Sequence, residues 1–133
     1  MKITDLKPTI VWKFFHQVTQ VPRPSKKEGK MIEFLESFAK EYKIAIKKDE
    51  AGNLLMSKPA TPGMEDRPVV VLQSHMDMVC EKNNGTKHDF DNDPIETIVD
   101  GEWLRANGTT LGADNGIGVA AELALLASDD IQH

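Results

Sequence analysis

The chain has 133 residues, 40% of them hydrophobic, which suits a single globular domain with an ordinary core. Its formal net charge is -5 and its lysines are scattered, which argues against a nucleic-acid partner because phosphate would repel it. No apolar run is long enough for a membrane span or a signal peptide, so we expect no membrane partner and a cytoplasmic location.

Two helices are expected first. One begins near Lys7, because apolar residues recur at helical spacing along one face, which comprises Ile10, Val11, Phe14, Phe15 and Val18. The prolines of Val21-Pro22-Arg23-Pro24-Ser25 end it. Ser25 and Glu28 match a capping box and predict a second helix over about 25–42.

A β-hairpin and a buried strand are expected next. Residues 44–48 and 54–58 flank a glycine-containing turn, which predicts a hairpin at a sheet edge. After a proline-rich surface loop, the apolar run 68–72 predicts a central strand buried on both faces. Cys80, the only cysteine, excludes an internal disulfide, favours a reducing compartment and is expected to be a small buried hydrophobe.

Ser74, His75 and Asp77 directly follow the apolar run. Ligands of open α/β sheets lie beyond the carboxyl ends of strands, so these side chains are candidates for a site. His75 and Asp77 point the same way in an extended backbone, and Asp77 can fix the imidazole tautomer so that the other nitrogen faces a metal. The alternative is a solvated polar strand end.

Residues 81–94 are polar and turn-rich, and they include a cluster of His88, Asp89, Asp91 and Asp93. The cluster lacks the spacing, the glycine and the closing glutamate of an EF-hand, which argues against a metal site there. Residues 95–99 and 103–106, joined by an Asp-Gly turn, predict a second hairpin that carries the chain to the next motif.

Glycines surround Asp114 and Asn115, and an apolar, alanine-rich segment follows over 116–127. The pattern predicts a tight turn feeding a largely buried helix, with a carboxylate where the backbone is most permissive. Two alternatives remain: helix capping by Asp114 or Asn115, and a phosphate loop, which the acidic side chain disfavours.

Taken together, His-Met-Asp-Met-Val after an apolar run and Gly-Thr-Thr-Leu-Gly-Ala-Asp-Asn-Gly-Ile-Gly downstream resemble the amino-terminal part of the co-catalytic zinc exopeptidases. Within that family the chain is most similar to the aminoacyl-histidine dipeptidases (Xaa-His dipeptidases). The likeness also includes the segments 21–25, 49–54, 58–65, 82–84, 88–90, 93–95 and 100–103.

The resemblance implies roles for three residues. His75 would bind one Zn²⁺, Asp114 would bridge two Zn²⁺ ions, and Asp77 would act in catalysis by orienting His75 from behind. Co²⁺ or Mn²⁺ could substitute for zinc. The peptide after the bridging aspartate is commonly cis in relatives.

The resemblance also implies an α/β fold: the amino-terminal part of a three-layer structure with helices packed on a mixed central sheet. The family's downstream Glu-Glu pair, further acidic ligand and distal histidine are absent from these residues. We therefore expect residues 1–133 to be the amino-terminal portion of the metal-binding catalytic domain, without the lid and dimerisation domain, and to be inactive alone.

The function implied for the complete protein is that of a cytoplasmic metallodipeptidase, a homodimer that hydrolyses dipeptides, Xaa-His among them, with metal-activated water. Two alternatives stay open. One is another amidohydrolase or aminopeptidase of the same fold, and the other is a non-catalytic binding module that keeps the fold without the metal.

Overall fold

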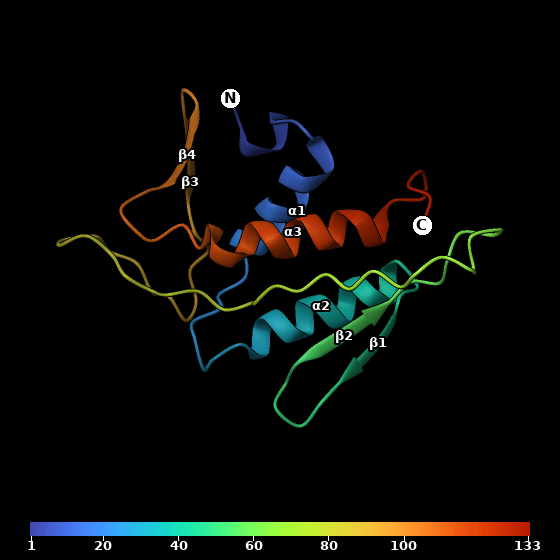
Figure 1. Cartoon of the computed structure of the whole chain (residues 1–133). Helices are drawn as coiled ribbons and strands as arrows, with labels where there is room; N and C mark the ends of the chain where they lie inside the picture. The colour runs from blue at the N-terminus through green and yellow to red at the C-terminus, as the bar shows by residue number, and fades with distance from the viewer.

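The computed structural model describes residues 1–133 and contains three α-helices and four short strands (Figure 1). The α/β class expected from the sequence is confirmed. No helix is both long enough and apolar enough to cross a membrane. The elements in chain order are η1 (Ile3–Asp5), α1 (Thr9–Thr19), α2 (Gly29–Glu41), β1 (Ala45–Lys48), β2 (Leu54–Ser57), β3 (Thr97–Asp100), β4 (Trp103–Ala106) and α3 (Ala113–Ala127).

The core lies among the three helices, and α1 runs directly behind α3 in Figure 1. Small residues on α3, including Gly116 and Ala120, are buried and let α1 approach closely. Phe14 of α1 meets Phe38 of α2 edge to face, with ring centroids 5.5 Å apart. The apolar spacing of the first helix produced the expected packing at Phe14, Phe15 and Val18, but Ile10 of the same predicted face is exposed. Helix α3 buries one face only, and Leu125 on its other side is exposed.

The two predicted hairpins are confirmed as antiparallel pairs, β1 with β2 and β3 with β4. Gly101 turns the second hairpin with φ of +60°, a conformation that glycine adopts readily. The strands pair only within their own hairpins, so the mixed central sheet is not formed by these residues.

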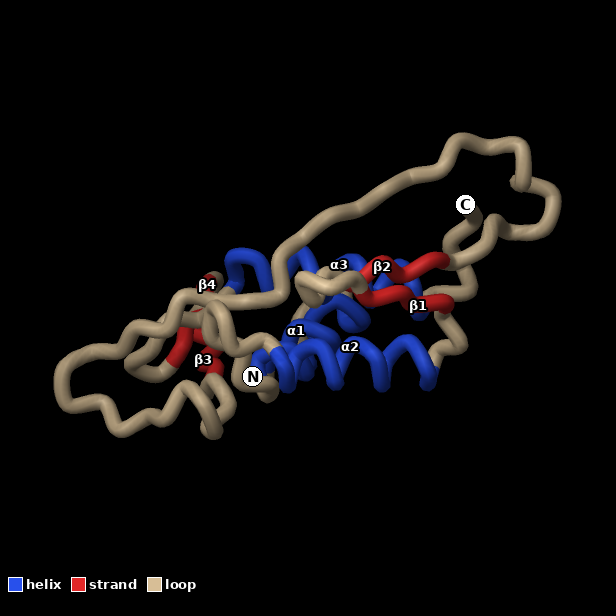
Figure 2. Tube along the Cα trace, turned by 90° about the horizontal axis from the view of Figure 1, so that it is seen from below, coloured by secondary structure: helices blue, strands red, loops and turns tan.

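The central strand expected over 68–72 is wrong for this structure. The segment is extended but unpaired, and Val69, Val70 and Val71 are exposed rather than buried. No backbone group of residues 69–76 bonds to another backbone group. In Figure 2 the segment belongs to the long tan tube, with no strand beside it. Without a neighbouring strand to pair its backbone N–H and C=O groups, an extended apolar run does not form a β-strand.

The predicted capping box at Ser25 is also wrong. Helix α2 begins at Gly29 with Glu28 before it, and the Glu28 carboxylate accepts a hydrogen bond from the Lys26 N–H. The Ser25 hydroxyl is engaged elsewhere, because it donates to Asp77 across the fold. A tertiary hydrogen bond has replaced the local cap.

Candidate functional site

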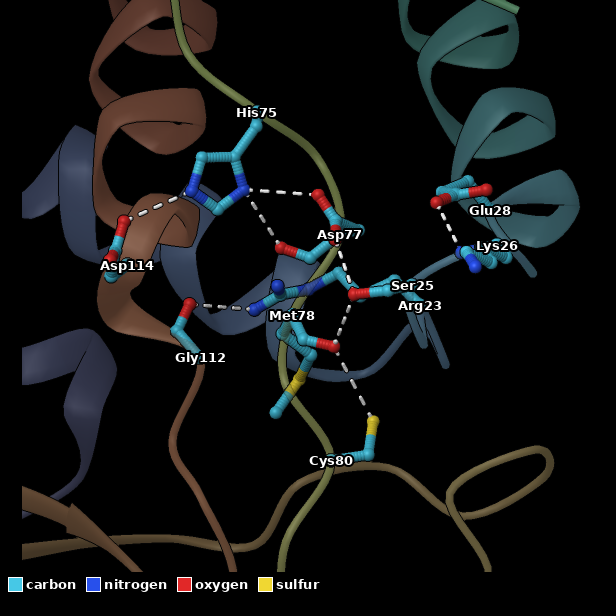
Figure 3. A network of polar contacts seen from close by, with 10 residues as sticks. All are labelled: Arg23, Ser25, Lys26, Glu28, His75, Asp77, Met78, Cys80, Gly112 and Asp114. Atoms are coloured by element: carbon cyan, nitrogen blue, oxygen red, sulfur yellow. Dashed lines mark hydrogen bonds and ion pairs between the residues drawn. The ribbon is translucent and has the colours of Figure 1, made fainter.

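His75 lies at the centre of a polar network that joins the extended segment to the start of α3 (Figure 3). Its Nε2 lies 3.0 Å from Asp114 Oδ1, although the two residues are 39 positions apart in the chain. Its Nδ1 lies 3.1 Å from both the backbone oxygen and Oδ1 of Asp77. The structure therefore brings all three sequence-predicted site residues together.

The position of His75 between two carboxylates changes its proton affinity. Partial burial acts to lower the pKa of His75, but the hydrogen bonds to Asp114 and Asp77 outweigh it, and the pKa is raised above the usual 6.5. Without a metal, the imidazole is thus stabilised as a cation.

Asp77 is fixed from its other side by Ser25. The Ser25 hydroxyl donates to Asp77 Oδ2 at 2.5 Å, and this bond is the main reason that the pKa of Asp77 lies below its usual value. Asp77 therefore stays ionised and faces Nδ1 of His75 through its other oxygen. Ser25 was interpreted from the sequence as a helix cap, and only its distance from Asp77 in space reveals this role.

Asp114 lies on a bend at the head of α3. Gly112 precedes it with φ of +71°, Asp114 itself has non-helical angles (φ -90°, ψ 104°), and the Asp114-Asn115 peptide is cis. The Asp114 side chain is 96% exposed. No side chain caps α3, so the capping alternative does not describe this turn.

Further contacts hold the extended segment and the start of α3 in place. Ser74 donates to the Glu122 carboxylate of α3 at 2.7 Å, which ties the extended segment to that helix. Arg23, for which the sequence pattern predicted no role, is buried and donates through Nη2 to the Gly112 carbonyl at 2.9 Å. Its position between two prolines gave no signal of this contact.

An imidazole nitrogen and a carboxylate oxygen are suitable zinc donors, and both side chains are open to solvent. His75 and Asp114 make up only part of a metal site. No group of three or more His, Cys, Asp or Glu side chains lies close enough together to hold a metal ion. The cluster around His88 forms no such group either. Asp89 and Asp93 instead accept hydrogen bonds within their own loop.

Comparisons with known proteins show that the chain is similar to part of known peptidases. No family model matches it. The chain is 48% identical over 132 residues to the cytosol non-specific dipeptidase of Escherichia coli (strain K12), covering 99% of this chain and 27% of that protein.

Two solved structures are similar as well. Aminoacylhistidine dipeptidase from Vibrio alginolyticus superposes with a TM-score of 0.97 at 49% identity, covering 100% of this chain and 27% of that one. A tripeptidase from Staphylococcus aureus, at 24% identity and a TM-score of 0.71, covers 88% of this chain and 31% of its own, and shows a shared fold alone. The chain thus spans about a quarter of the length of these relatives, and its resemblance to the aminoacyl-histidine dipeptidases is confirmed over that span.

Proposed function

We propose that the protein containing this chain is a metal-dependent dipeptidase, to which residues 1–133 contribute part of the metal site. The observation that carries the proposal is the 3.0 Å approach of His75 Nε2 and Asp114 Oδ1 in a chain about half identical to dipeptidases. Both side chains are exposed to solvent, so packing of the apolar core does not account for their approach.

Each of the three residues has a distinct task. His75 would hold one cation through Nε2, and Asp114 would hold two through its carboxylate. Asp77 would accept a hydrogen bond from Nδ1–H, from which it lies 3.1 Å away, and so would favour the tautomer whose Nε2 can bind metal. When bound, a pair of Zn²⁺ ions would polarise the scissile carbonyl and lower the pKa of the attacking water.

The substrate is proposed to be a dipeptide. One relative is named for aminoacyl-histidine substrates and another for non-specific dipeptide cleavage, so Xaa-His is a member of the expected class rather than its limit. We further propose a cytoplasmic homodimer for the complete protein. The 133-residue chain should be inactive by itself, because His75 and Asp114 supply only two of the donors that four-coordinate zinc requires.

The test is hydrolysis of Ala-His, Ala-Ala and a tripeptide by the complete protein with Zn²⁺, Mn²⁺ or Co²⁺. Metal-dependent cleavage of the dipeptides is expected, abolished by His75→Ala or Asp114→Ala. Asp77→Asn should lower activity by about 10- to 100-fold, as loss of a partner behind a metal-binding histidine typically does.

His88→Ala and Asp93→Ala are the matched controls, because they remove the same residue types from the polar loop outside the network. Both should keep activity. If the complete wild-type protein cleaves no dipeptide with any of the three metals, the dipeptidase proposal is wrong.

A further inference from the structure

Arg23 is the least expected residue of the interior. Its side chain is 1% exposed and belongs to the largest fully buried side chains of the chain. Its Nη2 donates to the Gly112 carbonyl, while Nε and Nη1 have no hydrogen-bond partner. Burying a guanidinium with two unpaired donors costs free energy, so a contribution to core stability alone does not explain its presence.

The backbone around Arg23 is bonded to the segment that carries His75 and Asp77. The Met78 N–H donates to the Arg23 carbonyl at 3.0 Å, and Pro24 and Met78 form a parallel bridge. Ser25, two residues on, donates to Asp77. Residues 23–25 are therefore bonded to the segment that carries the His75 and Asp77 half of the candidate site.

The Arg23 side chain reaches the other half. The Gly112 carbonyl accepts from the guanidinium and also from the Gly116 N–H at 3.1 Å, so it is held from two directions at the head of α3. A Cβ atom would lie 2.6 Å from Arg23 Nη2 at Gly112 and 2.8 Å at Gly116. A side chain at either position would therefore clash with the guanidinium. In Figure 3 the guanidinium points at the Gly112 carbonyl, beside the bend that carries Asp114.

We propose that Arg23 is a positioning residue, which joins the Asp114 turn to the His75 segment and so sets the distance between His75 and Asp114. The proposal rests on the proposed function for its catalytic meaning. Arg23 acts through the Gly112 carbonyl and is not one of the proposed metal donors. Its removal should therefore disturb the site more than it disturbs the helices.

Three variants separate positioning from packing. Arg23→Met keeps much of the volume and removes the donors. Arg23→Lys keeps the charge but lacks the planar fork and its reach, and it replaces Arg23→Met if that variant does not fold. Val18→Ala is the matched control, because Val18 is fully buried on α1 and lies beside Gly116, and its side chain has no donor for the Gly112 carbonyl.

The first readout needs no metal. In the metal-free complete protein, labelled at histidine and aspartate, nuclear Overhauser contacts between the His75 ring and the Asp114 β-protons report their distance. We expect these contacts to be lost in Arg23→Met, or in Arg23→Lys in its place, and kept in Val18→Ala. Contacts that survive in whichever Arg23 variant folds would overturn the proposal.

The second readout is titration with Co²⁺ alone, followed by its visible absorption. Relative to a Val18→Ala protein, the Arg23 variant should bind Co²⁺ about 10-fold or more weakly, and kcat should fall more than KM rises. Equal losses in both proteins would mean that Arg23 only supports the fold. If the wild type itself binds no Co²⁺, the proposed function fails, and the metal-free contacts still decide the role of Arg23.

Discussion

At the scale of single residues, the imidazole of His75 is held between Asp77 and Asp114, with 51% of the side chain exposed. Each ring nitrogen faces a carboxylate oxygen, which favours the protonated ring when no metal is present. A metal ion would have to displace the Nε2 proton, so binding should become stronger as the pH rises through the pKa of His75.

The first prediction concerns that pKa. In the metal-free protein, the pKa of His75 should lie above 6.5, and Asp114→Asn should lower it because one hydrogen-bonded carboxylate is removed. Histidine ring proton shifts in an NMR titration measure both values. Because the folded-state pKa is raised, the contact stabilises the fold below the unfolded pKa and is lost as the pH rises through the folded one.

Asp130→Asn is the control for this titration, since Asp130 is exposed near the carboxyl end and outside the network. It should leave the pKa of His75 unchanged. A pKa that does not respond to Asp114→Asn would contradict the contact between the two side chains.

The sequence predicted that His75, Asp77 and Asp114 lie together, as they do, but it did not predict the contacts of Ser25 and Arg23 with this region. Motif spacing marks residues that share a pattern, whereas Ser25 and Arg23 reach their partners from a different part of the chain. Ser25 was assigned to a local capping box because a local pattern cannot weigh a competing tertiary bond. Such supporting contacts become visible only in three dimensions.

At the scale of elements, the best predictions are those that depend on local pattern. The apolar spacing of α1 and the small, apolar residues of α3 indicate a buried face, and those faces meet in the core. Both hairpins follow from short strands around turns that contain Gly52 and Gly101. Each of these elements is specified by residues within its own segment.

The run 68–72 is the counterexample, because a strand requires partners as well as a sequence. β-branched residues favour an extended backbone, and the segment is extended. Each of the four strands pairs within its own hairpin, so no strand pairs with residues 68–72. Composition predicted the local conformation correctly and the burial wrongly.

The second prediction compares two leucines of α3. Leu123 is 2% exposed within the helical core, whereas Leu125 is 41% exposed. Leu123→Ala should lower the free energy of unfolding by about 2 to 5 kcal/mol, because it removes buried methyl groups and leaves a cavity. Denaturant unfolding followed by circular dichroism measures the change.

Leu125→Ala is the matched control on the same helix and should have a much smaller effect. Equal losses for the two substitutions would mean that the face toward α1 is not the one that stabilises α3.

At the scale of the whole molecule, one side of the structure is unusually apolar. A groove of about 900 Å³ lies beside the extended segment and is lined by residues of that segment, β2 and α3. Val70 in this segment is 79% exposed. Exposed apolar surface next to unpaired backbone groups favours association with other chains.

The third prediction is that the 133-residue chain self-associates and that Val70→Lys reduces the association, because a charge on the extended segment opposes strand pairing. Sedimentation velocity without detergent measures the distribution of species. Trp103→Lys, on the β3–β4 hairpin, changes a side chain of similar exposure (77%) and should leave association unchanged. A monodisperse wild-type monomer would contradict this account of the surface.

The claim on which the functional account depends is that His75 and Asp114 bind the same metal centre. A crystal structure of the complete protein loaded with Zn²⁺, with the metal located by anomalous scattering, tests it most directly. The account predicts a zinc ion about 2.0 to 2.2 Å from His75 Nε2 and from an Asp114 carboxylate oxygen. A protein whose zinc contacts neither side chain would contradict it.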